Sequence, residues 1–316
     1  MVSAVGHTPG MSTSILVVGR IGQVGHELAR GKWPAGFTVD FVERPQLDLT
    51  RPSEAQRIIV AARPDIVVNA AAYTAVDAAE SDRDTAFAVN RDGPAALAEI
   101  CREIGAALIH FSTDYVYDGA KADAYVETDP IAPLSVYGAS KAEGDAAIAA
   151  RLDRHVVLRT SWVYSAIGHN FVKTMLRLGA ERDRLGIVDD QHGSPTAAAE
   201  IAAATITICA ALAAGKEDGY GVFHFCGGGT TTWHGFAREI FRSAAARGLK
   251  TPRLVEPIAT EAYPTPAVRP GNSRLDCGKI ARVYGIAAPP WQESLSAVLD
   301  ELIPVAAPAE APVEVV

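Results

Sequence analysis

The fold is decided by residues 14–25, which read SILVVGRIGQVG. An apolar run, 14–18, ends in a turn that holds Gly19, Gly22 and Gly25, and a helical segment follows at once. Glycines at such a turn let the backbone approach a pyrophosphate closely, and the phosphate charge then lies at the helix N-terminus. A glycine triplet alone is weak evidence. Its place between a strand and a helix favours a nucleotide-binding turn over an ordinary glycine-rich loop.

Four more β-branched runs follow the first, with helical segments between them. Continuous apolar runs of this length suit strands buried on both faces, as in a parallel sheet. Pro52 and Gly105 are start and stop signals for two of the intervening helices. The pattern predicts an α/β fold with a Rossmann-like, doubly wound parallel sheet. The expected strands are 14–18, 38–42, 65–70, 107–112 and 155–160, and the expected helices are 23–31, 53–63, 84–105 and 135–151.

The second half has a different texture, with Ala-rich helices, isolated strands such as 221–226, and Pro-rich connectors. We expect residues 12–165 to form mainly a cofactor-binding domain. Residues 166–303 should form mainly a smaller α/β substrate-binding lobe that is interleaved with the first. The leader, 1–11, and the Pro- and Ala-rich tail, 304–316, are predicted to be disordered.

Composition excludes several classes of function. The net charge of −8 gives no basic footprint for nucleic acid or an anionic membrane surface. The longest weakly polar stretch, 201–214, is shorter than the roughly 20 apolar residues that a bilayer requires. The cysteines are widely spaced without a CxxC motif, which suits a reducing, cytoplasmic setting. They are Cys101, Cys209, Cys226 and Cys277.

Tyr137 and Lys141 lie four residues apart on a predicted helix, and therefore on one face. A neighbouring ammonium stabilises a phenolate and lowers the pKa of tyrosine from its usual value of about 10. Thr113, at the end of the fourth strand, could hydrogen-bond the substrate oxygen or the tyrosine hydroxyl. The alternative is an exposed helical pair without a role. The glycine turn earlier in the chain favours catalysis.

The end of the second strand should meet the adenosine ribose of a dinucleotide. An acidic residue there favours a free 2′-hydroxyl and NAD, whereas an arginine could accept the 2′-phosphate of NADP. Acidic residues and arginines are both present in this region, so NADH and NADPH remain alternatives. The candidates are Asp40, Glu43, Arg44 and Asp48, with Arg20 in the glycine turn.

The GxxGxxG spacing and the YxxxK pair are typical of short-chain dehydrogenases and reductases. Eight ordered motifs span the chain: GQVG at 22–25, NAAAYTAVD at 69–77, STDYVY at 112–117, YGASK at 137–141, RTSWVY at 159–164, DQHGSPT at 190–196, GTTTW at 229–233 and RPGNSRL at 269–275. Through these motifs nearly all of residues 14–303 resembles a family of the extended short-chain reductases, the dTDP-4-dehydrorhamnose reductases.

The resemblance implies reduction of the 4-keto group of dTDP-4-dehydro-L-rhamnose to dTDP-L-rhamnose, the last step of that nucleotide-sugar pathway. It makes Tyr137 the proton donor, supported by Thr113, and Lys141 the residue that tunes it and holds the nicotinamide ribose. Tyr137 and Lys141 thereby also contact the cofactor. The remaining cofactor contacts implied are Gly22, Gln23, Val24, Asp48, Leu49, Ala71, Ala72 and Tyr73. The sugar-nucleotide contacts implied are Thr113, Asp114, Trp162, Asn272 and Arg274, although Trp162 could instead be a core aromatic and Arg274 a structural ion pair.

Some members of the family pair through a magnesium ion held by glutamates, and the corresponding outer positions here are Glu27 and Glu301. The middle position is Ala199, with Glu200 one residue later. A one-residue shift turns a helical side chain by about 100°. We therefore interpret Glu27 and Glu301 first as solvated charges, with Mg²⁺ at a dimer interface as the alternative. Monomer and homodimer both remain open.

Two other functions compete with this interpretation. Another nucleotide-deoxysugar 4-ketoreductase or epimerase of the same group would share the glycine turn and the Tyr/Lys pair. A non-catalytic, NADP-binding regulatory subunit is the rival from a different class, because the regulatory subunit of methionine adenosyltransferase resembles this family. The intact Tyr137, Lys141 and Thr113 weigh against a subunit without catalysis.

Overall fold

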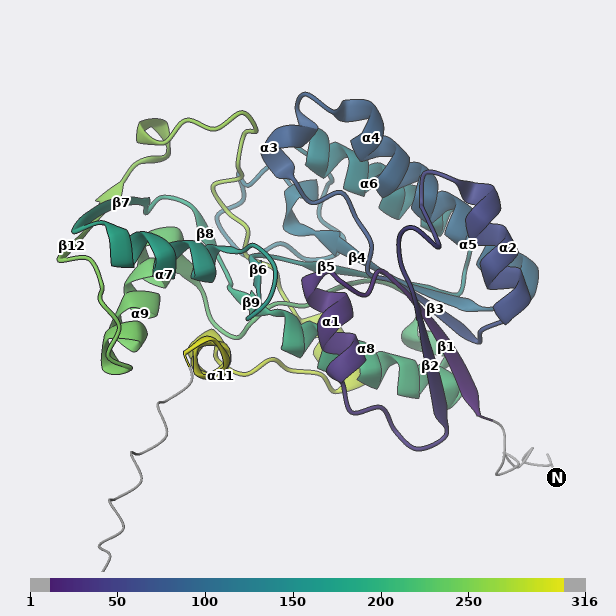
Figure 1. The fold of residues 1–316 in the computed structure, drawn as a ribbon. Helices are drawn as coiled ribbons and strands as arrows, with labels where there is room; N and C mark the ends of the chain where they lie inside the picture. Colours follow the sequence, from purple (N-terminus) through teal and green to yellow (C-terminus); the bar gives the residue numbers. More distant parts are fainter. Residues whose placement is uncertain (1–11, 304–316) are drawn as a thin grey trace, which may run out of the picture.

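The computed structural model describes residues 12–303 (Figure 1). The two segments predicted to be disordered, 1–11 and 304–316, lie outside the described residues. No helix in the described part of the chain is both long enough and apolar enough to cross a membrane.

A six-stranded, all-parallel sheet forms the centre of the molecule, in the order β10-β5-β4-β3-β1-β2 (Figure 1). The inner strands β3 and β5 are buried at every position, as continuous apolar runs predict. Each of the five strands expected in the first half is present. The bounds are β1 Thr13–Val18, β2 Phe37–Val42, β3 Ile66–Asn69, β4 Ala107–Thr113, β5 His155–Thr160 and β10 Gly221–His224.

Helices cover both faces of this sheet, which confirms the doubly wound α/β fold (Figure 1). Alternate residues of each strand point to opposite faces, so the sheet has one apolar core on each side. One core holds Ile15, Val17 and Leu28, and the other holds Leu16, Val18 and Ile59. The first face carries α1 Gln23–Arg30, α8 Ala198–Ala213 and α10 Gly278–Tyr284, and the second carries α2 Pro52–Ala62, α5 Gly93–Ile104 and α6 Val136–Ala149.

The strand at 221–226 is not isolated, contrary to our expectation. Residues 221–224 form β10, which pairs in parallel with β5 at the edge of the main sheet. Helix α8, also from the second half of the chain, packs on α1. Pairing between segments some 65 residues apart leaves no local signal in the sequence, because strand periodicity reports burial but not the partner. The division of the chain near residue 165 stays a prediction.

A second group of elements lies beside the main sheet and has its own apolar core (Figure 1). Phe236, Ile240 and Leu295 are fully buried in it. The group comprises α7 Phe171–Glu181, α9 Trp233–Ala246, α11 Trp291–Leu302, the parallel pair β7 Arg184–Val188 and β12 Leu254–Ile258, and the short strands β6 Val163–Tyr164, β8 His192–Gly193, β9 Thr196–Ala197 and β11 Thr231–Thr232.

The long helix expected over residues 84–105 is interrupted. Helix α4 ends at Phe87, a π-helical turn spans Ala88–Asp92, and α5 begins at Gly93. Pro94 has no backbone N–H, so the regular bonding pattern cannot run through this point. A π-turn inside a helix frequently marks a functional site. The other short helices before β4 are α3 Val76–Ala79 and α4 Arg83–Phe87.

The topology indicates that a ligand site lies at the carboxyl ends of the parallel strands. Strand β1 lies between β2 and β3, so the chain leaves it first in one direction and then in the other. Ligands of open α/β sheets bind at such a switch point, beyond the carboxyl ends of the strands. Gly19, Ala70 and Asp114 each follow directly after one of these strand ends.

Candidate active site

The glycine turn after β1 has room for backbone only at Gly19 and Gly25. Gly19 has a φ of +94°, and a Cβ there would lie 2.9 Å from the Ala71 nitrogen. A Cβ on Gly25 would lie 1.8 Å from the Gly19 carbonyl oxygen. At Gly22 a Cβ would meet only one atom, the Ala70 oxygen at 3.9 Å. Helix α1 begins after Gly22 without a side-chain cap, so its first N–H groups suit a bound pyrophosphate.

Gly25→Ala should lower both folding stability and cofactor affinity. We expect a loss of about 1–3 kcal/mol in the free energy of unfolding, because the methyl group would overlap a backbone oxygen. Denaturant unfolding measures the first effect, and titration of the fluorescence of reduced cofactor measures the second. Gly22→Ala is the matched control, with unfolding within about 0.5 kcal/mol of the parent. Equal stability of the two variants would contradict the packing argument.

A cleft of about 440 Å³ lies beside this turn, at the switch point of the sheet. Among the residues predicted to bind cofactor, those that line it are Gly19, Gly22, Asp48, Leu49, Ala71, Ala72 and Tyr73. Val24 instead packs against the core beneath α1, and Gly25 is buried under the turn. The open cleft, the bare helix start and the close-packed glycines together fit a dinucleotide.

Gln23, for which the resemblance implies a cofactor contact, also binds residues outside the glycine turn. Its Oε1 accepts hydrogen bonds from the Ser165 hydroxyl and the Asn170 amide, both at 3.0 Å. These partners come from the segment between β6 and α7. The side chain therefore ties the glycine turn to the neighbouring lobe.

The adenosine end of the cleft contains charges of both signs. Glu43 and Arg44 both line it, and a Glu43 carboxylate oxygen accepts a hydrogen bond from the Ile21 N–H at 3.1 Å. Asp48 accepts bonds from the Thr50 backbone and hydroxyl, which hold its pKa below the usual value. Asp40 is exposed and does not line the cleft, and the exposed Arg20 lies over the Phe41 ring at 5.8 Å.

Tyr137 lies in the first turn of α6, which begins where the Ser135 hydroxyl accepts a hydrogen bond from the Gly138 N–H at 3.1 Å. Burial and the Asp114 carboxylate raise the pKa of Tyr137, and the Thr113 hydroxyl acts in the opposite direction. The groups with the largest effects on this pKa do not include Lys141, whose amine lies against β4. The phenol is therefore held in its protonated form.

Lys141 is buried beneath the sheet edge, one turn further along α6. Its Nζ donates to the Phe111 carbonyl at 2.6 Å and lies 2.9 Å from His110 Nε2. Burial lowers the pKa of Lys141 to about 8, and the Asp145 charge opposes this effect. A lysine with such a pKa can change protonation state near neutral pH.

Asp145 and Arg159 form an ion pair under the site, at 3.1 Å from Nε to Oδ2, with both side chains only about 5% exposed. The same carboxylate oxygen accepts the Ser112 hydroxyl at 2.9 Å, and Arg159 also donates to the Tyr117 hydroxyl at 2.8 Å. Burial raises the pKa of Asp145, and Arg159 and Lys141 act against it. A pair this deep fixes α6 to β4 and β5.

Asp114 follows Thr113 at the end of β4 and is almost fully buried. Its Oδ1 accepts the Thr113 hydroxyl at 3.0 Å, while its Oδ2 has no partner within hydrogen-bond geometry. Burial raises the pKa of Asp114 to about 6, and the nearby Ser273 hydroxyl acts in the opposite direction. An unsatisfied buried carboxylate oxygen is suited to accept a hydroxyl from a ligand.

Asp114→Asn should stabilise the protein in a pH-dependent manner. Because the Asp114 pKa is higher in the folded state, the parent loses stability as pH rises from about 4 through about 6. An amide cannot ionise, so the variant gains up to about 3 kcal/mol over the parent at pH 7.5, and less at pH 4. Urea unfolding at the two pH values measures the difference. A gain that is independent of pH would refute this origin.

Trp162 lies just beyond β5 with a φ of +50°, a left-handed conformation that is strained for a bulky residue. It is half-buried and stacks on Trp233, with centroids 3.6 Å apart and planes at 12°. A Cβ on Gly193 would lie 2.5 Å from the Trp162 ring, so the close packing requires glycine there. The ring is therefore partly accessible and packs against the apolar core of the lobe.

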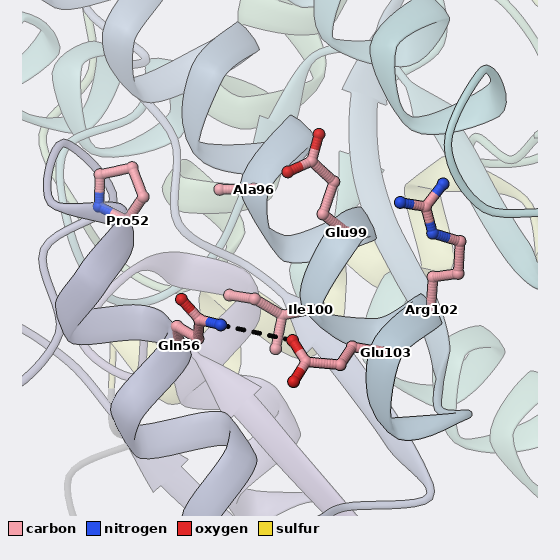
Figure 2. Close-up of a pocket in the computed structure, with 7 residues that line it drawn as sticks. All are labelled: Pro52, Gln56, Ala96, Glu99, Ile100, Arg102 and Glu103. Carbon is pink, nitrogen blue, oxygen red and sulfur yellow. Dashed lines mark hydrogen bonds between the residues drawn. The ribbon is translucent and has the colours of Figure 1, made fainter.

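A second hollow of about 460 Å³ lies between α2 and α5 (Figure 2). Figure 2 shows Gln56 of α2 reaching Glu103 of α5, at 3.3 Å from Nε2 to Oε2. Glu99 at its rim forms an ion pair with Arg151. The hollow shares no residue with the cleft at the glycine turn, and two of its polar groups, Gln56 and Glu103, bind each other. The candidate site is therefore the cleft at the sheet edge.

The chain is similar to known proteins in sequence and in fold. The family described as RmlD substrate binding domain matches residues 13–303. A dTDP-4-dehydrorhamnose reductase of Sinorhizobium fredii is 46% identical over 284 residues, which cover 89% of this chain and 94% of that protein. The chain belongs to the dTDP-4-dehydrorhamnose reductase family. The enzyme of that name from Escherichia coli K12 is 41% identical, over 92% of this chain and 98% of its own length.

A solved structure of a member of this family has the same fold as this chain. The dTDP-4-dehydrorhamnose reductase of Bacillus anthracis, in complex with NADP, superposes with a TM-score of 0.85 at 34% identity. The match covers 92% of this chain and all of that one. That enzyme binds NADP, a dinucleotide of the kind that the glycine turn of this chain predicts.

Two residues for which the family resemblance implies a substrate contact form hydrogen bonds within the protein. The Asn272 amide donates to the carbonyls of Lys121 and Asp123, at 2.7 and 2.8 Å. Its Oδ1 accepts from Arg274 Nε at 2.8 Å, and Arg274 also donates to the Ala122 carbonyl. Asn272 therefore anchors the loop at 121–123, and a role in substrate binding stays a prediction for both residues.

The glutamates that correspond to the family's magnesium ligands are joined by an arginine. Arg30 Nη1 lies 2.6 Å from a Glu301 oxygen and 3.6 Å from a Glu27 oxygen. Glu200, on α8, accepts the Ser294 hydroxyl of α11 at 3.2 Å. Within residues 12–303 no group of three His, Cys, Asp or Glu side chains is placed to hold a metal ion. Glu27 and Glu301 are thus members of an ion-pair cluster on the surface.

Sequence reasoning missed a buried asparagine in the π-turn of this reductase. Asn90 accepts the Tyr73 N–H at 2.9 Å and donates to the Tyr73 carbonyl and the Ser140 hydroxyl, each at 3.0 Å. It thereby clamps the cofactor cleft to α6. Gly93 and Pro94, inside the predicted helix, were the available signal, because that pair disrupts regular helical bonding.

Proposed function

We propose that this chain catalyses the NAD(P)H-dependent reduction of dTDP-4-dehydro-L-rhamnose to dTDP-L-rhamnose, the last step of dTDP-rhamnose biosynthesis. The observation that carries the proposal is the pairing of Tyr137 with the Thr113 hydroxyl at the sheet edge that also carries the glycine-turn cleft, with Lys141 one turn further along the same helix. Identity above 40% with dTDP-4-dehydrorhamnose reductases over nearly their full length supports the choice of substrate. The NADP complex of the Bacillus anthracis enzyme supports NADPH as one usable cofactor.

The cofactor, when bound, supplies the hydride that reduces the keto carbon. The protein provides the matching proton. Tyr137 keeps its proton because burial and Asp114 raise its pKa, so a phenol is ready to protonate the alkoxide that develops on the sugar. Thr113, whose hydroxyl acts on Tyr137, orients the phenol. The Lys141 ammonium offsets the negative charge that remains on the phenolate.

We assign the residues that contact the substrate from their hydrogen-bonding capacity and their aromatic character. The unpartnered Asp114 Oδ2 is an acceptor for a sugar hydroxyl, and the exposed part of Trp162 offers an apolar surface for a ring. We infer that residues 12–165 hold mainly the cofactor and residues 166–303 mainly the nucleotide sugar. We also infer a cytoplasmic location, because the cysteines are free thiols, which suits a reducing compartment.

The direct test is the loss of reduced-cofactor absorbance when the enzyme meets dTDP-4-dehydro-L-rhamnose made in the tube by the upstream enzymes. NADH and NADPH are run in parallel, and the product is identified as dTDP-L-rhamnose by mass and chromatography. Cofactor binding without turnover of this sugar would refute the proposed substrate. Other nucleotide ketosugars, tested in the same assay, would then distinguish a related reductase from a non-catalytic subunit.

A further inference from the structure

A continuous chain of buried polar groups runs beneath the cleft, from the Ala71 N–H to Lys141. Asn69 Oδ1 lies 3.2 Å from the Ala71 nitrogen, and Asn69 Nδ2 lies 3.0 Å from His110 Nδ1. His110 Nε2 lies 2.9 Å from Lys141 Nζ, whose other partner is the Phe111 carbonyl. Asn69, His110 and Lys141 are each no more than 1% exposed. Their hydrogen bonds must therefore be satisfied within this chain.

The donors and acceptors of this chain do not permit every protonation state. Burial and the neighbouring Lys141 lower the pKa of His110 far below its usual value, so the ring is neutral and has a single N–H. With Asn69 Oδ1 on the Ala71 N–H, the Asn69 amide donates to His110 Nδ1. The ring proton must then lie on Nε2, where it donates to Lys141. Only a neutral amine has the lone pair to accept it.

A protonated Lys141 requires the opposite arrangement. An ammonium has donors only, so His110 Nε2 must accept and the ring proton must move to Nδ1. Asn69 must then rotate its amide so that Oδ1 accepts from Nδ1. The Ala71 N–H loses its acceptor, which is unfavourable for a donor at the edge of the cleft.

We propose that Asn69 and His110 are positioning residues that couple the protonation of Lys141 to the hydrogen bond of the Ala71 N–H at the floor of the cleft. The Nε2–H tautomer of His110 accompanies the neutral amine, and the Nδ1–H tautomer accompanies the ammonium. The inference rests on the proposed function only in that the ammonium serves the Tyr137 phenolate. Any acceptor that takes over the Ala71 N–H frees Asn69 to rotate, and so favours the ammonium.

Other charged groups act on Lys141 as well. Asp145, on the same helix, favours the ammonium, and Arg159 on β5 partly neutralises Asp145. Asp114 and Tyr137 lie at the outer end of α6, where Asp114 acts on the phenol. None of these groups has two tautomers that exchange donor and acceptor positions. A tautomer change at His110 is therefore specific to the coupling through Asn69 and His110.

The tautomer of His110 can be observed by ¹⁵N NMR of the full chain labelled at histidine. The chain has 8 histidines, and the His110 signals are those that disappear in His110→Gln. We expect Nδ1–H below the transition and Nε2–H above it, with a midpoint near the Lys141 pKa of about 8. Lys141→Met should abolish the transition. This measurement needs neither substrate nor turnover.

Asn69→Asp tests the amide directly. A carboxylate has acceptors on both sides, so one oxygen can keep the Ala71 N–H while the other accepts from His110 Nδ1. The Nδ1–H tautomer should then persist, and the alkaline limb of the kcat/KM profile should move up by about one pH unit or more. Asn69→Asp in a His110→Phe background is the control for added charge. The upward shift should be lost there.

Three results would contradict the proposed coupling through Asn69 and His110. The first is a single His110 tautomer in the parent enzyme from about pH 6 to about pH 10. The second is a transition that persists in Lys141→Met. The third is an equal shift of the alkaline limb with and without His110, which would assign the effect to charge alone. Parent turnover of the ketosugar is measured separately, so a failure of the proposed function would be recognised as such.

Discussion

Tyr137→Phe lowers kcat for ketosugar reduction by about 10²–10⁴-fold, the range typical of removing a general acid. The phenylalanine ring keeps the packing against Tyr115, whose ring lies edge-to-face at 5.7 Å, but has no proton to donate. The affinity for reduced cofactor should change little, because the glycine turn is untouched. Steady-state turnover and fluorescence titration of the cofactor measure the two quantities in the same preparation.

Tyr115→Phe is the matched control for this prediction. Its hydroxyl accepts a hydrogen bond from Arg269 at 3.0 Å, and that guanidinium also pairs with Asp77 at 2.8 Å. Loss of the Tyr115 hydroxyl should therefore leave most of the activity. A folded Tyr137→Phe variant that turns over at the parent rate would remove Tyr137 from the mechanism.

Arg159→Leu lowers the free energy of unfolding by about 3–5 kcal/mol, because it leaves the Asp145 carboxylate buried without its countercharge. Both side chains are about 5% exposed, so solvent cannot replace the lost partner. Chemical denaturation at neutral pH measures the effect. The loss should diminish at lower pH, because burial already raises the pKa of Asp145 and protonation removes the unpaired charge.

Two further variants compare the buried ion pair with an exposed one. Arg159→Leu combined with Asp145→Asn should recover part of the lost stability, since no bare charge remains. Arg177→Leu removes an exposed partner of Glu181 and should change stability by less than about 1 kcal/mol. If Arg159→Leu had an effect as small as Arg177→Leu, the buried pair would not stabilise the fold.

Local patterns in the sequence determined the scaffold. The apolar run 14–18, the glycines that follow it and the four-residue spacing of Tyr137 and Lys141 depend on near neighbours only, and each lies where the pattern predicts. The cleft then follows from topology, because parallel strands end at the same edge. The ordered motifs also predicted the family, which the comparisons confirm.

Tertiary structure alone decided the chemistry around those residues. The spacing of Tyr137 and Lys141 places them on one face of α6, and only the folded chain shows that Lys141 also contacts His110 and the Phe111 carbonyl on β4. The resemblance implies a substrate contact for the motif at 269–275, and only the folded chain shows that the Asn272 amide donates to backbone carbonyls of a distant loop. In both cases the partner is far away in sequence, and no local pattern reports it.

The sequence by itself therefore determined where the strands, the glycine turn and the Tyr/Lys helix lie, because periodicity and turn chemistry act over a few residues. Tertiary structure decided that β10 completes the sheet, that Arg159 neutralises Asp145, and that His110 faces Lys141. These features depend on burial and on contacts across many residues. Burial changes the energy of a charge or an unpaired donor, and only the folded chain determines which groups are buried together.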